Sequence, residues 1–299
     1  MIVEPPRCRA RMRNSQQTRR EARAPLSQPT AAPRFSADEI AVCLGEPVHF
    51  LGSGAFGDTW QADNEAVKII CTDDYPRARL EREVEGLSRV SSPYVVAFHG
   101  LREFQLGGAL RPALRFEYIS GGDVEQRLNG GDLVPTESIV GFLQGLLLGI
   151  QALHKAATIH RDIKPANIAL RGGRWDCPVL LDLGLAKQMD ASTITVYPGH
   201  IGTMPYMSPE QLEGRRARKA ADLWAVGVVV RQMITGRHPF YLPNEKYTIS
   251  EAHERLASGP ESLPKSCPEP VKQVLDRLTS VVEHERGSSA SNLIRLAAH

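Results

Sequence analysis

This chain lacks the features that define several classes of protein. Its five cysteines are widely spaced and include no C-x-x-C pair, so the sequence supports neither a disulfide framework nor a zinc site. No secretory apolar region follows the first methionine, so export is not expected. The longest apolar run, residues 139–153, is shorter than the roughly 18 residues of a membrane span. We therefore expect a cytoplasmic protein with no transmembrane segment.

The net charge is also low, at +2 over 299 residues. This balance does not favour a nucleic-acid partner, and the length suggests two lobes or two domains. Residues 1–35 differ from the rest, since arginines are mixed with proline, serine and glutamine without apolar periodicity. Such a segment cannot bury enough apolar surface to offset its ordering entropy. We expect a disordered basic tail over residues 1–35 that is dispensable for catalysis.

The apolar run carries a regular glycine spacing. Gly141, Gly145 and Gly149 recur every four residues along the helix expected over residues 139–153. This spacing fits a contact between membrane helices or close packing inside a soluble core. The second interpretation is favoured because the helix leads directly into a polar loop.

That polar loop has the residue types that phosphoryl transfer requires. It reads His-Arg-Asp-Ile-Lys-Pro-Ala-Asn over residues 160–167, and Asp182 follows a short distance later. Phosphoryl transfer needs oxygen ligands for a metal ion, a cation for the phosphates and a group that orients the attacking hydroxyl. Asp162, Lys164, Asn167 and Asp182 supply all of these groups.

A glycine-rich motif, Gly-Ser-Gly-Ala-Phe-Gly, occupies residues 52–57. A dinucleotide-binding fold would place a helix after such a motif. Here a strand, an Asp-Asn turn and a second strand containing Lys68 are expected instead. The motif therefore predicts a flap over phosphates rather than a dinucleotide site.

The helix expected over residues 77–90 has an apolar stripe of Leu80, Val84 and Leu87. At about 100° per residue, Glu83 lies roughly 60° from Leu80, at the edge of that stripe. An inward-facing acid needs a cation, since burial of a lone charge is costly.

Together and in this order, the motifs resemble those of the protein kinases over about residues 46–299. The Thr203, Met207 and Gln211 positions are similar to the bacterial serine/threonine branch. The resemblance implies an α+β, two-lobed kinase fold. Its small β-rich N-lobe would cover about residues 46–118, and its larger helical C-lobe would cover about residues 121–299.

The resemblance also implies the roles of the site residues. Asp162 would orient the substrate hydroxyl, and Lys164 would steady the transferring phosphate. Asn167 and Asp182 would bind Mg²⁺, and Glu83 would pair with Lys68. The residues implied to hold ATP are Gly52, Ser53, Gly54, Ala55, Phe56, Gly57, Thr59, Ala66, Lys68, Glu83, Glu117, Ile119, Asn167 and Asp182.

Other positions are implied to be structural. Glu210 would pair with Arg286, Asp222 would anchor the catalytic loop, and Phe116 would close the pocket behind the adenine. Three positions depart from the family pattern: Leu183 replaces the phenylalanine of D-F-G, Thr59 replaces the usual valine, and Ala169 is smaller than usual.

The function implied is a cytoplasmic, ATP- and magnesium-dependent serine/threonine protein kinase that acts on protein substrates. Autophosphorylation is expected at Ser192, Thr193 or Thr195, with Arg161 receiving the phosphate, and self-association would allow it in trans. Two alternatives are a pseudokinase-type nucleotide-binding scaffold and a small-molecule phosphotransferase. Pseudokinases typically lose a residue such as Lys68, Asp162 or Asp182, and all three are present.

Overall fold

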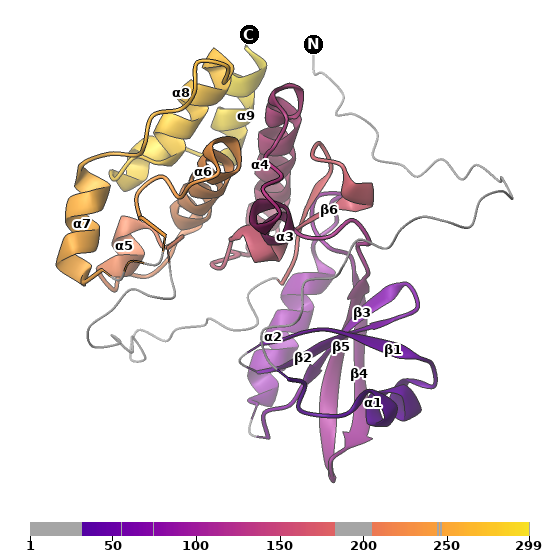
Figure 1. The fold of residues 1–299 in the computed structure, drawn as a ribbon. Helices are drawn as coiled ribbons and strands as arrows, with labels where there is room; N and C mark the ends of the chain where they lie inside the picture. The colour runs from indigo at the N-terminus through magenta and orange to yellow at the C-terminus, as the bar shows by residue number, and fades with distance from the viewer. Residues whose placement is uncertain are drawn as a thin grey trace, which may run out of the picture.

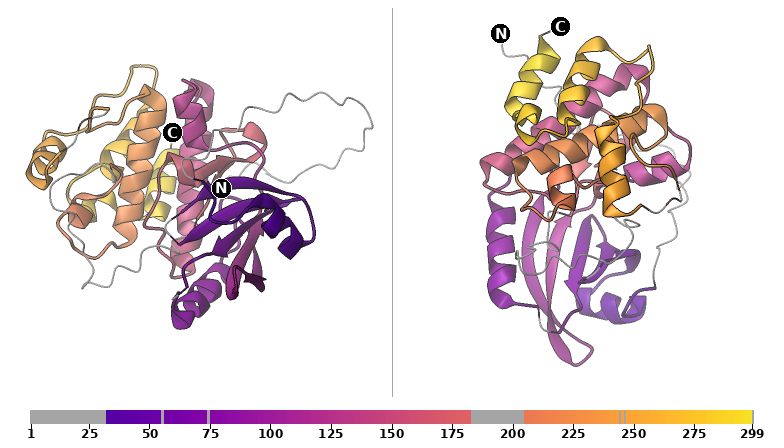
Figure 2. Two further views of the ribbon diagram at one scale, coloured as in Figure 1. Left: turned by 60° about the horizontal axis from the view of Figure 1, so that its bottom comes forward. Right: turned by 90° about the vertical axis from the view of Figure 1, so that its left-hand side faces the viewer.

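The computed structural model describes residues 32–54, 56–73, 75–182, 205–243, 245 and 247–298. It has a sheet lobe and a helical lobe (Figure 1). The sheet has five antiparallel strands in the order β1-β2-β3-β5-β4. Helices α1 and α2 lie on opposite sides of this sheet (Figure 2). The elements of this lobe are α1 (Ala37–Leu44), β1 (Val48–Ser53), β2 (Gly57–Ala62), β3 (Glu65–Ile70), α2 (Arg77–Ser88), β4 (Phe98–Leu106) and β5 (Ala109–Glu117).

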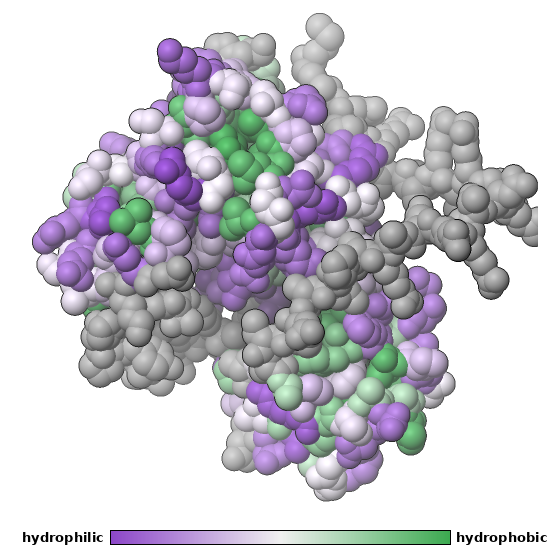
Figure 3. Space-filling view, in the orientation of Figure 1, coloured by the Kyte–Doolittle hydropathy of each residue, from purple (hydrophilic) through white to green (hydrophobic). Residues whose placement is uncertain are grey.

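The second lobe is mainly helical and carries one small antiparallel hairpin, β6 with β7. The two-lobed α+β architecture predicted from the sequence is therefore confirmed. On the face shown in Figure 3, hydrophilic side chains gather on the helical lobe where it borders the sheet lobe. Its elements are α3 (Val124–Asn129), η1 (Thr136–Ser138), α4 (Ile139–Lys155), η2 (Pro165–Asn167), β6 (Ile168–Leu170), η3 (Arg171–Gly173), β7 (Pro178–Leu180), α5 (Pro209–Leu212), α6 (Lys219–Thr235), α7 (Ile249–Ala257), α8 (Glu269–Leu278), η4 (Glu283–Arg286) and α9 (Ser289–Ala297).

Helix α4 runs through the core of the helical lobe. By length and hydropathy alone, the segment Thr136–Lys155 would pass as a membrane span. Its apolar side chains instead pack against α6, α8, α9 and β7. An added Cβ at Gly145 would lie 2.6 Å from Pro178, and one at Gly149 would lie 2.8 Å from the carbonyl oxygen of Tyr94. The glycine spacing therefore serves close packing in a protein core, as predicted.

The folded region begins earlier than the sequence suggested. Helix α1 was not predicted, yet Ile40 is fully buried and packs with Trp60 on the outer side of the sheet. Ser36 caps this helix in a capping box with Glu39. Of the predicted tail, residues 32–35 belong to the sheet lobe, because Phe35 packs against the same apolar cluster. Residues 1–31 lie outside the described residues.

The cysteines show one departure from the sequence expectation. Cys43, Cys71 and Cys267 are free thiols, whereas Cys177 is disulfide-bonded.

Candidate active site

The polar loop predicted to be catalytic lies between α4 and β6 and is anchored to α6. Asp222, 1% exposed, accepts hydrogen bonds from the backbone amides of His160 at 3.0 Å and Arg161 at 2.8 Å. Arg161 has a φ of 66°, an unfavourable backbone conformation for a non-glycine residue. The two bonds hold the loop in this conformation, and Asp222 has the anchoring role predicted for it.

Three predicted site residues meet in this loop. The side-chain amide of Asn167 donates to the carbonyl oxygen of Asp162 at 2.7 Å and to its Oδ2 at 3.1 Å. Lys164 Nζ lies 3.2 Å from the same Oδ2. Because the amide nitrogen of Asn167 is used as a donor, its amide oxygen is the atom available to a cation. The loop thus combines a carboxylate, an ammonium group and a neutral oxygen ligand.

An ion pair joins this loop region to the sheet lobe. Lys68 Nζ, on β3, lies 2.5 Å from Oδ1 of Asp182, which follows β7. The Lys68 side chain is 12% exposed, whereas that of Asp182 is 41% exposed. The structure therefore brings the predicted phosphate-binding cation next to a predicted metal ligand.

Glu83 differs from the sequence expectation of an ion pair with Lys68. Its carboxylate accepts hydrogen bonds from Tyr75 Oη at 2.9 and 2.8 Å and from Arg79 Nε at 3.1 Å. Burial raises the pKa of Glu83, and these two donors and the nearby Lys68 charge oppose that rise. Glu83 does face inward, as helix periodicity predicted, but local donors hold it in this structure.

The glycine motif forms the turn between β1 and β2. The amide of Gly54 donates to the carbonyl of Gly57 at 2.8 Å. Gly57 has no room for a side chain, since a Cβ there would lie 1.9 Å from the carbonyl oxygen of Ile69. Gly52, Ser53 and Phe56 flank this turn, while Ala55 lies outside the described residues.

The residues predicted to surround the adenine lie on β2, β3, β5 and β6. In the β-ladders Thr59 is opposite Lys68, and Ala66 is opposite Phe116. The ring of Phe116 packs on Phe98 at 5.5 Å between centroids, and Ala169 is also buried.

At the end of β5, the amide of Glu117 donates to Ala97 and that of Tyr118 donates to Asn64. Both amides already donate to backbone carbonyl oxygens of the protein. The next backbone N–H along the chain is that of Ile119. Glu117 also forms an ion pair with Arg171, which lowers the pKa of Glu117. The sequence did not predict the contact between Arg171 and Glu117, because Arg171 lies outside the recognised motifs.

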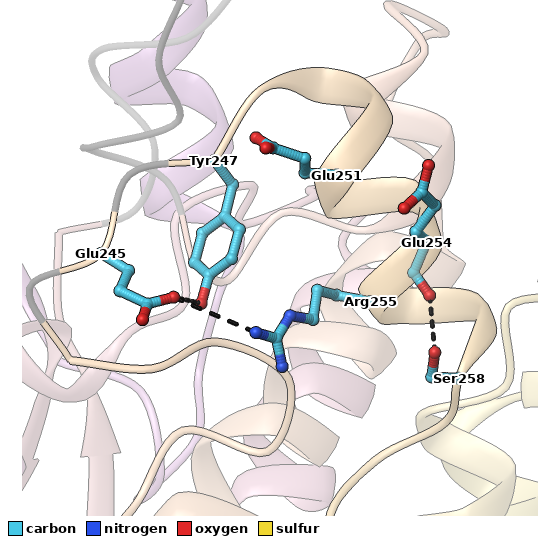
Figure 4. A pocket seen from close by; sticks show the side chains of 6 residues that line it. All are labelled: Glu245, Tyr247, Glu251, Glu254, Arg255 and Ser258. Atoms are coloured by element: carbon cyan, nitrogen blue, oxygen red, sulfur yellow. Dashed lines mark hydrogen bonds and ion pairs between the residues drawn. The ribbon is translucent and has the colours of Figure 1, made fainter.

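A pocket of about 470 Å³ lies away from this site, around α7. Glu251, Glu254 and Arg255 project from the helix, and Glu245 and Tyr247 come from the segment before it (Figure 4). Tyr247 Oη donates to Glu245 at 2.6 Å, and Arg255 lies 4.0 Å from the same carboxylate. Its lining contains none of the predicted site residues, so we place the active site at the loop and the glycine motif.

Comparisons with known proteins agree with this geometry. A family model for the protein kinase domain matches residues 46–295. Serine/threonine-protein kinase PkaA of Streptomyces coelicolor is 30% identical over 84% of this chain and 48% of its own length. Mitogen-activated protein kinase kinase 9 of Arabidopsis thaliana is 30% identical over 79% of this chain and 78% of its own. The chain therefore belongs to the protein kinase family. Bacterial serine/threonine kinases and a plant kinase kinase are similar to it at about the same identity.

A solved structure shows the same fold. Rad53 1–466 in complex with AMP-PNP superposes with a TM-score of 0.64 at 23% identity, covering 82% of this chain and 62% of that one. The chain spans about half the length of PkaA and 29% of a relative from Thermomonospora curvata.

The position of Glu83 leads to a prediction about activity. Kinase catalysis requires the strand lysine to pair with the helix glutamate, and Tyr75 competes for that glutamate here. Tyr75→Phe should therefore raise the transfer rate by up to about tenfold, since a hydrogen bond to a charged group contributes roughly 1.5 kcal/mol or more. Glu83→Gln should lower the rate, measured as phosphate transfer from radiolabelled ATP.

The matched control is Glu85→Gln on the same helix. Glu85 is exposed and pairs with Arg89, so its neutral substitution should leave the rate unchanged. A larger loss in Glu85→Gln than in Glu83→Gln would show that the helix register assigned to the active site is wrong.

Proposed function

We propose that this chain is an active protein kinase that transfers the γ-phosphate of ATP to serine and threonine hydroxyls of protein substrates. The observation that carries the proposal is a set of two contact groups, which are linked by the hydrogen bond that the amide of Leu181 donates to the carbonyl oxygen of Asn167 at 2.9 Å. Lys68 is paired with Asp182, and Asp162, Lys164 and Asn167 form one contact network. A scaffold without catalysis would not need all of these groups together, so the pseudokinase alternative is less well supported.

The donor set fits ATP with Mg²⁺. Mg²⁺ is usually bound through one or two protein oxygen ligands together with substrate phosphates, and the carboxylate of Asp182 and the amide oxygen of Asn167 are such ligands. Among the described residues, no three His, Cys, Asp or Glu side chains form a metal cage. When bound, Mg²⁺ would neutralise charge on the phosphates.

The chain's own residues then divide the remaining work. Asp162 Oδ2, next to Lys164, would hold the proton of the substrate hydroxyl and orient the attacking oxygen. Lys164 would offset charge on the transferring phosphate, and Lys68 would position the other phosphates. The glycine motif would exclude water above them.

The test is transfer of radiolabel from ATP to a generic protein acceptor, with Mg²⁺ and with a chelator, followed by phosphoamino-acid analysis. We expect Mg²⁺-dependent phosphoserine and phosphothreonine. Label in phosphotyrosine alone, or only in small molecules, would contradict the acceptor class. Binding of ATP without any transfer would favour the scaffold.

We further propose that the chain phosphorylates its own activation segment. The acceptors predicted from the sequence, Ser192, Thr193 and Thr195, lie outside the described residues. Arg161 supports the proposal because burial, followed by the charge of Arg216, lowers the pKa of Arg161. An anion beside these two arginines would relieve their mutual repulsion and form charge-assisted hydrogen bonds. Self-association in trans and the cytoplasmic location stay predictions.

Mass spectrometry of protein incubated with ATP and Mg²⁺ checks this second proposal. We expect one phosphate between residues 192 and 195 in the parent, and none in an Asp162→Asn control. A fully active enzyme with an unmodified segment would contradict it.

A further inference from the structure

A buried carboxylate lies directly behind the glycine motif. Asp58 follows the last glycine of the motif and is fully buried. A buried charge is costly unless donors surround it. Asp58 accepts from the backbone amide of Arg34 at 2.6 Å, from Arg34 Nη1 at 2.5 Å and from Ser53 Oγ at 2.7 Å. Two of these three bonds come from one residue, 24 positions earlier in the chain.

The guanidinium of Arg34 also reaches across the motif. Nη1 donates to Ser53 Oγ at 2.9 Å, and Nη2 donates to the carbonyl oxygen of Gly54 at 2.9 Å. Ser53 ends β1, Gly54 lies inside the turn, and Asp58 is on β2. Arg34 thus ties together both strands of the glycine motif and its turn.

Arg34 is itself held by folded structure. The next residue, Phe35, lies 5.5 Å beneath the guanidinium of Arg111 and packs against the apolar cluster of the sheet. Gly107 makes room for it, since a Cβ there would lie 2.7 Å from the Phe35 ring. Residues 32–45 precede the family match, which begins at residue 46. Arg34 therefore contacts the glycine motif from a folded segment that precedes the region matched by the kinase family model.

We propose that Arg34 is a positioning residue for ATP, which holds the glycine motif in the shape that covers the phosphates. The proposal rests on the proposed kinase function. A loop that is already ordered binds its ligand more tightly, because less conformational entropy is lost on binding. Arg34 contacts the motif and not the catalytic loop, so its effect falls on nucleotide affinity rather than on turnover at saturating ATP.

The experiment compares full-length Arg34→Ala and Arg34→Lys with the parent. For Arg34→Ala we expect the Kd for the non-hydrolysable analogue AMP-PNP, measured by calorimetry, and the KM for ATP to rise about five- to tenfold. The kcat should stay within about twofold of the parent. Lysine keeps one charge but lacks the fork that reaches Asp58 and Gly54 together, so Arg34→Lys should be intermediate. Arg89→Ala, which removes an exposed arginine of the same lobe, is the control and should match the parent.

Loss of Arg34 also leaves Asp58 buried without its main partner, so stability has to be separated from positioning. Asp58→Asn and the double variant Arg34→Ala/Asp58→Asn remove that buried charge. If Arg34 positions the motif, the double variant still binds AMP-PNP weakly, because the bond to Gly54 is absent. Its rise in melting temperature on adding AMP-PNP should then be smaller than the rise of Asp58→Asn.

Parental AMP-PNP affinity in Arg34→Ala and in the double variant, at any melting temperature, would overturn the inference while leaving the kinase function intact. A parent that binds AMP-PNP with the expected pattern but transfers no phosphate would overturn only the proposed function. A parent that binds no nucleotide would overturn both.

Discussion

Asp162→Asn should lower the kcat for phosphate transfer by roughly 10²–10⁴, the range that a positioned proton acceptor contributes. Asparagine has the same shape and still accepts a hydrogen bond from Asn167, so the loop should keep its fold. What is lost is the carboxylate charge beside Lys164 and the atom that takes the substrate proton. Because no contact joins Asp162 to the described residues of the glycine motif or to Glu117 at the end of β5, the Kd for AMP-PNP should change little.

The control for this prediction is Asp176→Asn. Asp176 pairs with Arg174 in the same lobe but lies outside the catalytic loop, so its variant should retain parental kcat. Radiolabel transfer at saturating ATP and acceptor measures both variants. Parental kcat in Asp162→Asn would remove the catalytic assignment of residues 160–167.

The motifs that are contiguous in sequence predicted which polar residues lie close together in the loop. Asp162, Lys164 and Asn167 are within five residues of one another, so a single loop brings them together almost regardless of the rest of the fold. The distant contacts of Asp222 and Glu210 were accessible only through the family resemblance. The structure bears both out, since the backbone amide of His160 donates to Asp222 and the guanidinium of Arg286 donates to Glu210.

The partner of Glu83 could not be predicted in the same way. Helix periodicity gives the direction of a side chain but not its nearest donor. Tyr75 precedes the helix and Arg79 lies one turn before Glu83, so both reach the carboxylate. Two local donors therefore satisfy the buried acid in this structure, while Lys68 pairs with Asp182.

The Arg34 contact was missed for a different reason. The segment around it continues an arginine-rich stretch without periodicity, and composition alone assigned it to the tail. One signal was present: Ser36 followed by Glu39 is a capping-box pattern that marks a helix start. The burial of Asp58, which requires a partner such as Arg34, is visible only in the structure.

The ion pair between Glu210 and Arg286 should have the largest effect on stability. Arg286 Nη1 lies 2.7 Å and Nη2 2.9 Å from the two carboxylate oxygens of Glu210, and both side chains are almost fully buried. The guanidinium also donates to the carbonyl oxygen of Ser280 and lies 5.0 Å from the ring centre of Trp224. Breaking a buried pair from one side leaves the other charge without compensation.

Arg286→Met should therefore lower the free energy of unfolding by about 3–5 kcal/mol in urea denaturation at neutral pH. Arg237→Met is the control, because Arg237 and Glu261 form an exposed pair worth about 1 kcal/mol or less.

Burial raises the pKa of Glu210, but the bonds and charge of Arg286 outweigh it and lower the pKa overall. The pair thus stabilises the parent above the ordinary glutamate pKa of 4.5 and loses that contribution as the pH falls through the lowered value. Protonation also removes the uncompensated charge in the variant, so the difference between parent and Arg286→Met should shrink in acid. Equal losses in Arg286→Met and Arg237→Met, or a difference independent of pH, would contradict this account of the pair.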